Sequence, residues 1–363
     1  MANYKEIKGL TVQNLSADPT LNAGTAGQVW FNSTTGKLKS LVAISAWSSA
    51  SNCITARRLR TGFGTQDAGT MAFGYGPGAG VFNAEEFNGS AWSTGGTSPT
   101  PLTANDEGSD QVGTSGSSGL SAGGYRNSPA GNVSNTNEYD GTSWSGGGAL
   151  PAVRAGGIAG FGSVAAGVVA GGRVAPIQVA ITDEYASSTW TNVNNLNTAR
   201  KEIAGCGPQS AGLAVGGGTP STSTANVEEY DATSWAAGAD LPSVDQKMGA
   251  VGNSGDCLAY GGAPSPSTAT TDSQTYDGSA WTAGPSLATA TYTAGHFGTV
   301  SAAVYSSGQI AGGDYVNGTQ IFNKDIFYRL PGAWASGGSL GTGRQAFTGM
   351  GTSTAALVAG GEI

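Results

Sequence analysis

The sequence predicts an all-β fold, a seven-bladed β-propeller in which each blade is a four-stranded sheet. Glycine is abundant, with 61 residues, whereas Lys and Arg together number only 16. Because 38% of the residues are hydrophobic, this glycine content does not indicate disorder. Tryptophan recurs every 45 to 53 residues, an interval typical of propeller repeats, at Trp47, Trp92, Trp144, Trp190, Trp235, Trp281 and Trp334.

A short phrase precedes several of these tryptophans. Residues 138–143 read Glu-Tyr-Asp-Gly-Thr-Ser before Trp144, and residues 229–234 read Glu-Tyr-Asp-Ala-Thr-Ser before Trp235. An Asp-Gly pair predicts a two-residue type I′ hairpin turn, because both central positions of that turn need a positive φ. We therefore expect the aromatic residue and the tryptophan to lie on paired strands.

A second mark is a run of small residues that ends in Gly-Gly, as in residues 165–172 and 355–361. Where the pair occurs, its first glycine follows the preceding tryptophan by 26 to 31 residues. Small residues suit strands near a propeller axis, where backbones crowd together. The glycine pair allows a close approach that a Cβ atom would prevent.

A third mark is the residue ten positions after each tryptophan. Four repeats have arginine there, namely Arg57, Arg154, Arg200 and Arg344, and the other three have Leu102, Asp245 and Thr291. One interpretation is a ring of arginines that faces a ligand. The alternative is a residue that bonds the repeat internally, since a guanidinium has five N–H donors. We favour the second interpretation, because residues that recur in repeats mostly stabilise the repeat.

The ends of the chain are expected to share the closing blade. The last repeat begins at Trp334 and lacks a hairpin phrase, whereas residues 28–39 supply aromatic residues and a turn-rich segment. We therefore predict that blade seven combines residues 334–363 with about 28–46, which removes a free sheet edge. The other blades are expected near 47–91, 92–143, 144–189, 190–234, 235–280 and 281–333. This gives a propeller over residues 28–363, with residues 1–27 as an attachment arm.

Composition excludes several classes of partner. A net charge of −8 without a basic cluster disfavours nucleic acid, whose phosphates need grouped Lys and Arg. The first ten residues lack the apolar stretch of a signal peptide, and no run is long enough to be inserted in a membrane. The odd set of Cys53, Cys206 and Cys257 fits neither a disulfide framework nor a zinc site, so we expect buried thiols.

No catalytic, cofactor-binding or metal-binding residues are predicted, and the ligand-binding residues are unknown. His296 is the only histidine, whereas the usual copper, zinc and iron sites need two or three. A glycosidase needs two carboxylates beside one bond, but Glu138, Glu184 and Glu229 recur at one phase of the repeat. No dinucleotide-binding or P-loop motif is present. We therefore expect a protein that is not an enzyme and has no cofactor.

The repeat as a whole resembles a kelch-like repeat family of virion proteins from marine tailed bacteriophages. The matching segments are residues 227–235 (VEEYDATSW), 195–200 (NLNTAR), 337–344 (GGSLGTGR) and 355–361 (AALVAGG), together with the opening residues 1–12 and residues 28–38 (QVWFNSTTGKL). Blades two and six depart from the pattern. The resemblance implies a kelch-like propeller that serves as a tail fibre, tail appendage or surface decoration of a virion, is made in the host cytoplasm, and functions in host attachment.

The expected partners follow from this resemblance. They are other virion proteins, bound through residues 1–27, and a host-surface glycan or protein, and the chain is expected to form a homo-oligomer or a multicopy assembly. Residues 106–118 and 315–330 are longer than their counterparts, and aromatic residues between Tyr315 and Tyr328 could stack on sugars. Local packing is the favoured explanation of those aromatics. A cellular kelch-type scaffold and a carbohydrate-active enzyme are the alternative functions.

Overall fold

The computed structural model describes residues 13–20, 28–58, 61–97, 112–127, 130–219, 222–265, 267–331, 348–352 and 355–359. The chain divides into two units. Unit 1 comprises Met1–Ala43 and Phe327–Ile363, and unit 2 comprises Ile44–Ile326. The sequence predicts a propeller over residues 28–363. Unit 2 instead begins at Ile44, sixteen residues later, and ends at Ile326. Strands β3 (Lys37–Ala50) and β32 (Thr319–Pro331) each run from one unit into the other.

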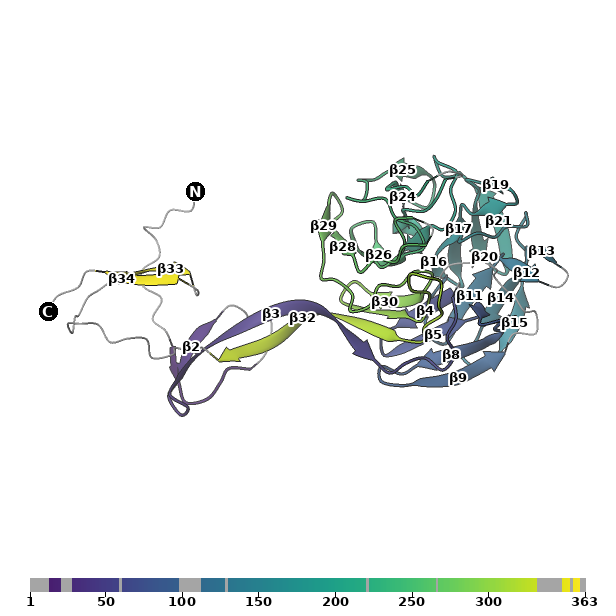
Figure 1. The fold of residues 1–363 in the computed structure, drawn as a ribbon. Helices are drawn as coiled ribbons and strands as arrows, with labels where there is room; N and C mark the ends of the chain where they lie inside the picture. Colours follow the sequence, from purple (N-terminus) through teal and green to yellow (C-terminus); the bar gives the residue numbers. More distant parts are fainter. Residues whose placement is uncertain are drawn as a thin grey trace. The chain divides into compact units, whose positions relative to one another are not determined.

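Unit 2 is built from antiparallel four-stranded sheets, called blades below (Figure 1). Blade one has β4 (Thr61–Thr65), β5 (Ala68–Ala72), β8 (Asn83–Phe87) and β9 (Trp92–Thr97). Blade two has β10 (Val112–Ser115), β11 (Ser118–Ala122), β14 (Thr136–Tyr139) and β15 (Trp144–Gly147). Blade three has β16 (Ala159–Ser163), β17 (Ala166–Ala170), β20 (Thr182–Ala186) and β21 (Thr189–Val193).

The remaining blades follow the same plan. Blade four has β22 (Ala204–Cys206), a 3-10 turn (Gln209–Ala211), β23 (Gly212–Val215), β24 (Val227–Tyr230) and β25 (Trp235–Ala237). Blade five has β26 (Gly249–Asn253), β27 (Asp256–Tyr260), β28 (Ser273–Tyr276) and β29 (Trp281–Ala283). Blade six has β30 (Gly295–Thr299), β31 (Ala302–Ser306), β32 and β3. The described residues therefore form an all-β, propeller-like fold.

The first strands of the blades contact one another in a cycle. The contacts run from β4 through β10, β16, β22 and β26 to β30, and β30 in turn contacts β4. The described residues thus contain six blades, and the seven-bladed ring predicted from the sequence is not confirmed. The cycle of contacts closes without a blade made from residues 334–363 and 28–46.

Trp47 explains the different number of blades. It lies on β3, the fourth strand of blade six, and its ring packs 5.4 Å from that of Phe322 on β32. Tyr276 and Trp281 make the matching stacked contact in blade five, at 4.9 Å. Trp47 therefore completes the last blade rather than beginning the first. Trp334, which the sequence assigned to a seventh blade, lies outside the described residues.

The hairpin phrase folds as predicted in kind but not in length. Tyr139 pairs with Trp144, which leaves a four-residue turn in which Gly141 has a φ of 92°. The carboxylate of Asp140 accepts hydrogen bonds from the backbone N–H groups of Thr142 and Ser143, and these bonds lower its pKa. The predicted type I′ geometry occurs instead in blade three, where both Ser187 and Ser188 have a positive φ.

The Gly-Gly pairs lie where blades approach closely. Gly216 has a φ of 61°, and a Cβ atom there would lie 2.5 Å from the carbonyl oxygen of Asp245. The pair therefore supplies both a left-handed backbone and the absence of a side chain, as the sequence predicted. Short β-ladders in the connections that follow these pairs are β6 (Tyr75–Gly76) with β7 (Ala79–Gly80), β12 (Tyr125–Asn127) with β13 (Ala130–Asn132), and β18 (Arg173–Val174) with β19 (Ile177–Gln178).

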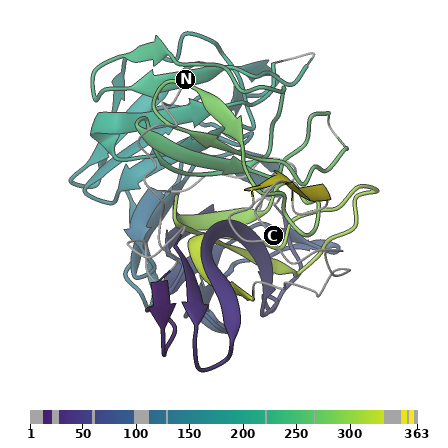
Figure 2. The same ribbon diagram turned by 90° about the vertical axis from the view of Figure 1, so that its left-hand side faces the viewer.

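Unit 1 contains β1 (Gln13–Leu15) paired in parallel with β2 (Val29–Asn32), which pairs with β3 in turn, and the hairpin of β33 (Thr348–Thr352) and β34 (Ala355–Ala359) (Figure 2). Asp18 joins the first three strands. Its carboxylate accepts hydrogen bonds from Trp30, Asn32 and Lys39, and these contacts lower its pKa to about 2. Among the described residues, no helix is long and apolar enough to cross a membrane.

Candidate functional site

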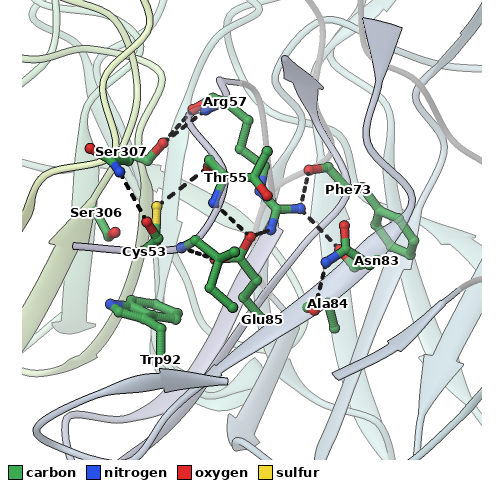
Figure 3. A network of polar contacts seen from close by, with 12 residues as sticks. Cys53, Thr55, Arg57, Phe73, Asn83, Ala84, Glu85, Trp92, Ser306 and Ser307 are labelled. Atoms are coloured by element: carbon green, nitrogen blue, oxygen red, sulfur yellow. Dashed lines mark hydrogen bonds and ion pairs between the residues drawn. The ribbon is translucent and has the colours of Figure 1, made fainter. Parts of the chain in front are cut away.

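Arg57 is enclosed by its own blade (Figure 3). Its guanidinium donates hydrogen bonds to the carbonyl oxygens of Phe73 (3.2 Å) and Asn83 (2.9 Å) and forms an ion pair with Glu85. Both side chains of the ion pair are completely buried. Burial lowers the pKa of Arg57, and the charge of Glu85 opposes that shift. The guanidinium therefore holds strands of one blade together and does not face a ligand.

Arg154 and Arg200 repeat this arrangement. Arg154 donates to two backbone carbonyls and to Asp183 (2.5 Å), and Arg200 donates to three backbone carbonyls and to Glu228 (3.0 Å). Burial lowers the pKa of both arginines. These contacts support the structural interpretation that the sequence favoured. Arg344 lies outside the described residues.

The blades without arginine have also lost the acid. In blade five Asp245 takes the arginine position and Gln274 the acid position, and blade six has Thr291 and Gln320. The side-chain oxygen of Gln320 accepts from the backbone N–H of Thr289, as Glu85 accepts from the N–H of Ile54 and Thr55. In blade six the acid position thus keeps its backbone contact without either charge, whereas blade five retains the carboxyl group of Asp245 at the arginine position.

A second repeated contact joins neighbouring blades. The hydroxyl of Tyr230 donates to Glu184 of blade three (2.7 Å), and that of Tyr276 donates to Glu229 of blade four (2.6 Å). Tyr139 with Glu86 and Tyr185 with Glu138 form the same pair at the two preceding seams. Burial raises the pKa of Tyr276 to about 12. The repeated glutamates therefore bridge blades, in agreement with the interpretation that they do not form one glycosidase site.

One end of the ring differs from these repeated contacts. Glu202, Lys247 and Thr293 occupy one phase of blades four, five and six, just before the first strand, and their φ values are 55°, 61° and 55°. The N–H of Glu202 donates to Gly156, that of Lys247 to Glu202, and that of Thr293 to Lys247. A backbone chain thus runs across four blades where their first strands begin. Side chains in this left-handed region cost of order 1–3 kcal/mol each, and such strain clusters at functional sites.

The charged side chains at this end are adjacent. Lys201 and Lys247 place their ammonium groups 3.3 Å and 3.6 Å from the carboxylate of Glu202. A Cβ atom on Gly156 would lie 3.0 Å from the Cβ of Arg173 and 3.6 Å from that of Lys201, so those two residues flank one glycine. Two ammonium groups therefore lie beside one carboxylate, and Arg173 and Lys201 flank Gly156 next to them. We call Arg173, Lys201, Glu202, Lys247 and Thr293 the axial mouth.

Aromatic rings lie beside these cations. The ammonium of Lys247 is 5.5 Å from the centre of the Tyr292 ring. At the seam of blades one and six, the guanidinium of Arg58 lies 5.9 Å from the Tyr75 ring and 5.6 Å from the Tyr315 ring. Tyr315 belongs to the longer connection that the sequence singled out. Phe322 of the same segment is buried in the core of blade six, whereas the side chains of Phe327 and Tyr328 are not described.

The opposite end of the ring has another character. Exposed acids lie there in or directly beside the turns between first and second and between third and fourth strands, namely Asp67, Asp140, Asp231, Asp256 and Asp277. At this end Lys324 lines one cleft together with Asp256 and Asp277. The six first strands also enclose an axial cavity of about 200 Å³ toward this end. One positive-φ glycine of each blade lines it, in order Gly64, Gly113, Gly162, Gly207, Gly252 and Gly298.

Other expectations have clear outcomes. His296 is buried against the Tyr260 ring, and burial lowers its pKa to about 4, so it is neutral at pH 7. No group of three or more His, Cys, Asp or Glu residues in the described ranges could hold a metal ion. In the longer segment of blade two, residues 112–115 and 118 lie in strands, and residues 98–111 are outside the described part.

The comparisons with known proteins support the fold alone. No protein-family model and no curated protein sequence matches the chain. A solved structure described as "Structure of YjhT" is similar, with a TM-score of 0.63 and 14% sequence identity. The match covers 77% of this chain and 99% of the YjhT chain. Unit 2, Ile44–Ile326, accounts for 283 of the 363 residues, which is a similar share of the chain.

Proposed function

We propose that Ile44–Ile326 is a complete six-bladed propeller and that it is a binding module rather than an enzyme. Its ligand is a glycan that carries carboxylate groups, and it binds at the axial mouth. The observation that carries this proposal is the pair of Lys201 and Lys247 beside the carboxylate of Glu202, on a strained backbone, with Arg173 next to Lys201 at Gly156. Fixed cations beside one acceptor suit a ligand with both an anionic group and hydroxyls.

The contrast with the rest of the ring supports this assignment. Arg57, Arg154 and Arg200 are wholly buried, so their charges serve the blades. The cations of the mouth are partly exposed, with 24% of the Lys201 side chain and 13% of the Lys247 side chain accessible. They are held by Glu202, which gives them a defined position that a ligand carboxylate can use. The ring of Tyr292 lies beside Lys247 and offers an aromatic surface on which a sugar ring can pack.

The proposed setting is a bacteriophage virion, in which the chain is a tail fibre, tail appendage or decoration. The resemblance of the repeat to kelch-like virion proteins supports this setting. In the proposal, unit 1 joins the ring to other virion proteins, and Asp18 fastens β1, β2 and β3 within it. Incubating a fragment of residues 44–326 with particles that lack the protein checks this role. Attachment of that fragment would contradict it.

Lys247 gives the sharpest test of the ligand site. Replacement of Lys247 by Gln removes one cation of the mouth, and we expect about a tenfold or greater loss of affinity for a carboxylated glycan. The affinity should also fall with added salt. Titration calorimetry on the full chain, after an array has selected the glycan, measures both effects.

Lys324 is the matched control, because it is an exposed lysine beside the acidic turns. Lys324→Gln should leave the affinity unchanged. Equal binding of neutral and carboxylated glycans, or a loss that appears only in the Lys324 variant, would contradict the proposed site. Turnover of the bound glycan would contradict a role confined to binding.

A further inference from the structure

Two of the three thiols meet at the seam between blades four and five. Cys206 ends β22 and pairs with Leu213, whereas Cys257 is the second residue of β27 and pairs with Tyr276. Their Sγ atoms are 3.4 Å apart, and both residues are buried at 1% exposure or less. The third thiol, Cys53, lies elsewhere and contacts the carbonyl oxygen of Thr55. Two sulfur atoms from adjacent blades are therefore already in contact.

Each of these two cysteines also borders a cavity. Cys206 lines the axial cavity of about 200 Å³, together with Gly207 and Gly252. Cys257 lines a separate cleft of about 540 Å³ that Thr275 and Phe322 also border. One water molecule occupies about 30 Å³ in the liquid, so a two-oxygen molecule such as hydrogen peroxide fits either cavity. A small oxidant in either cavity would therefore lie beside a cysteine of this pair.

We infer that Cys206 and Cys257 form an inter-blade disulfide when the protein meets a peroxide. In the first step the Cys206 sulfur attacks one peroxide oxygen, the O–O bond breaks, and the thiol proton leaves with the other oxygen as water. In the second step the Cys257 sulfur attacks the sulfenic acid on Cys206, the S–O bond breaks, and a second water carries away the Cys257 proton. Two thiols are oxidised by two electrons, and the peroxide is reduced to two waters.

The order of the two steps follows from the surroundings. Burial raises the pKa of the Cys257 thiol, so Cys257 stays protonated and acts second. Both thiols border a cavity, and it is the protonated state of Cys257 that leaves Cys206 as the thiol oxidised first. The new bond would close a loop between residues 51 positions apart and tie β22 to β27. This inference does not depend on the proposed ligand or on the virion setting.

Intact mass and peptide mapping of the full chain test the inference. After treatment with hydrogen peroxide, the mass should fall by two hydrogen atoms, and one cross-linked peptide pair should contain Cys206 and Cys257. Reduction with dithiothreitol should restore the original mass. The melting temperature of the oxidised protein should be higher by about 5 °C or more, because the cross-link restricts the unfolded chain.

Cys53→Ser is the matched control and should behave as the wild type does, whereas Cys206→Ser should show neither the mass loss nor the thermal shift. The wild-type peptide map decides the matter even if the Cys206 variant does not fold. Oxygen addition to the cysteines without a cross-link, a disulfide between two copies, or two unreacted thiols after full treatment would each overturn the inference.

Discussion

Blades three and four differ from blades five and six in how they hold their strands together. In the first two, a buried arginine forms an ion pair with an acid on the third strand, Arg154 with Asp183 and Arg200 with Glu228. In the last two, the same positions hold Asp245 with Gln274 and Thr291 with Gln320. The fold is the same in both regions, so the ion pair is one of two solutions to the same backbone requirement.

The difference teaches that these positions change as pairs. A buried guanidinium without its acid, or an acid without its guanidinium, leaves an uncompensated charge in the blade. An amide such as that of Gln320 can bond the backbone N–H and carbonyl of Thr289 without any charge. The Tyr–Glu contacts between blades also change as pairs. Thr275 takes the glutamate position of blade five, and Phe322 takes the tyrosine position of blade six, the next blade.

Asp183→Ala should give the largest effect on this comparison. The substitution strands the buried guanidinium of Arg154, and we expect a loss of about 3–5 kcal/mol in the free energy of unfolding. Gln274→Ala removes the neutral counterpart in blade five and should cost about 1–2 kcal/mol. Chemical denaturation of the two variants checks the ranking. Equal losses would show that the ion pair has no special role.

Asp245→Asn should act in the opposite direction. Burial raises the pKa of Asp245 to about 7 in the folded protein. A raised folded pKa means that the stability contribution is complete below the unfolded pKa of about 3.9 and is lost as the pH rises toward 7. The asparagine variant should therefore be more stable than the wild type by about 1–3 kcal/mol at pH 8. At pH 4 the two proteins should be nearly equal.

Unfolding curves at both pH values test this expectation. A constant difference between the two proteins at pH 4 and pH 8 would mean that Asp245 does not titrate in this range. Asp183→Asn provides the contrast, because in blade three the acid has a guanidinium partner. There the loss of the carboxylate charge should destabilise the protein at pH 8.

Tyr276→Phe should have the smallest effect of the series. It removes the hydroxyl that donates to Glu229 across the seam of blades four and five, while the ring stays packed on Trp281. We expect a loss of about 1 kcal/mol, the usual value of one such hydrogen bond. Glu229→Gln, which retains an oxygen acceptor, should lose less. A Tyr276 variant with wild-type stability would show that solvent replaces the contact.

The sequence was sufficient for the fold class and for the role of the repeated residues. The interval between tryptophans indicated blades, and the recurrence of Arg57, Arg154 and Arg200 favoured a structural role. The predicted seven blades are not confirmed, and the proposed six differ from them because spacing alone places Trp47 at the start of the first blade. The pairing of its strand with one almost three hundred residues away has no local signal.

The axial mouth was not predicted, for a related reason. A left-handed φ at Glu202, Lys247 and Thr293 arises from how neighbouring blades meet, and none of these residue types indicates it. The sequence gives one indication of a left-handed backbone at this position, because blade three has a glycine there, Gly156. The matched loss of Arg and acid 28 or 29 residues apart could have been found by aligning the repeats, since it needs no three-dimensional information.

A crystal structure of the full chain tests the central claim most directly, namely that Ile44–Ile326 forms a complete six-bladed ring that β3 closes. The account predicts six blades around the axis, with Trp47 packed on Phe322 in the sixth. A ring of seven blades, in which Trp334 and residues up to Ile363 form a sheet with residues 28–46, would contradict it.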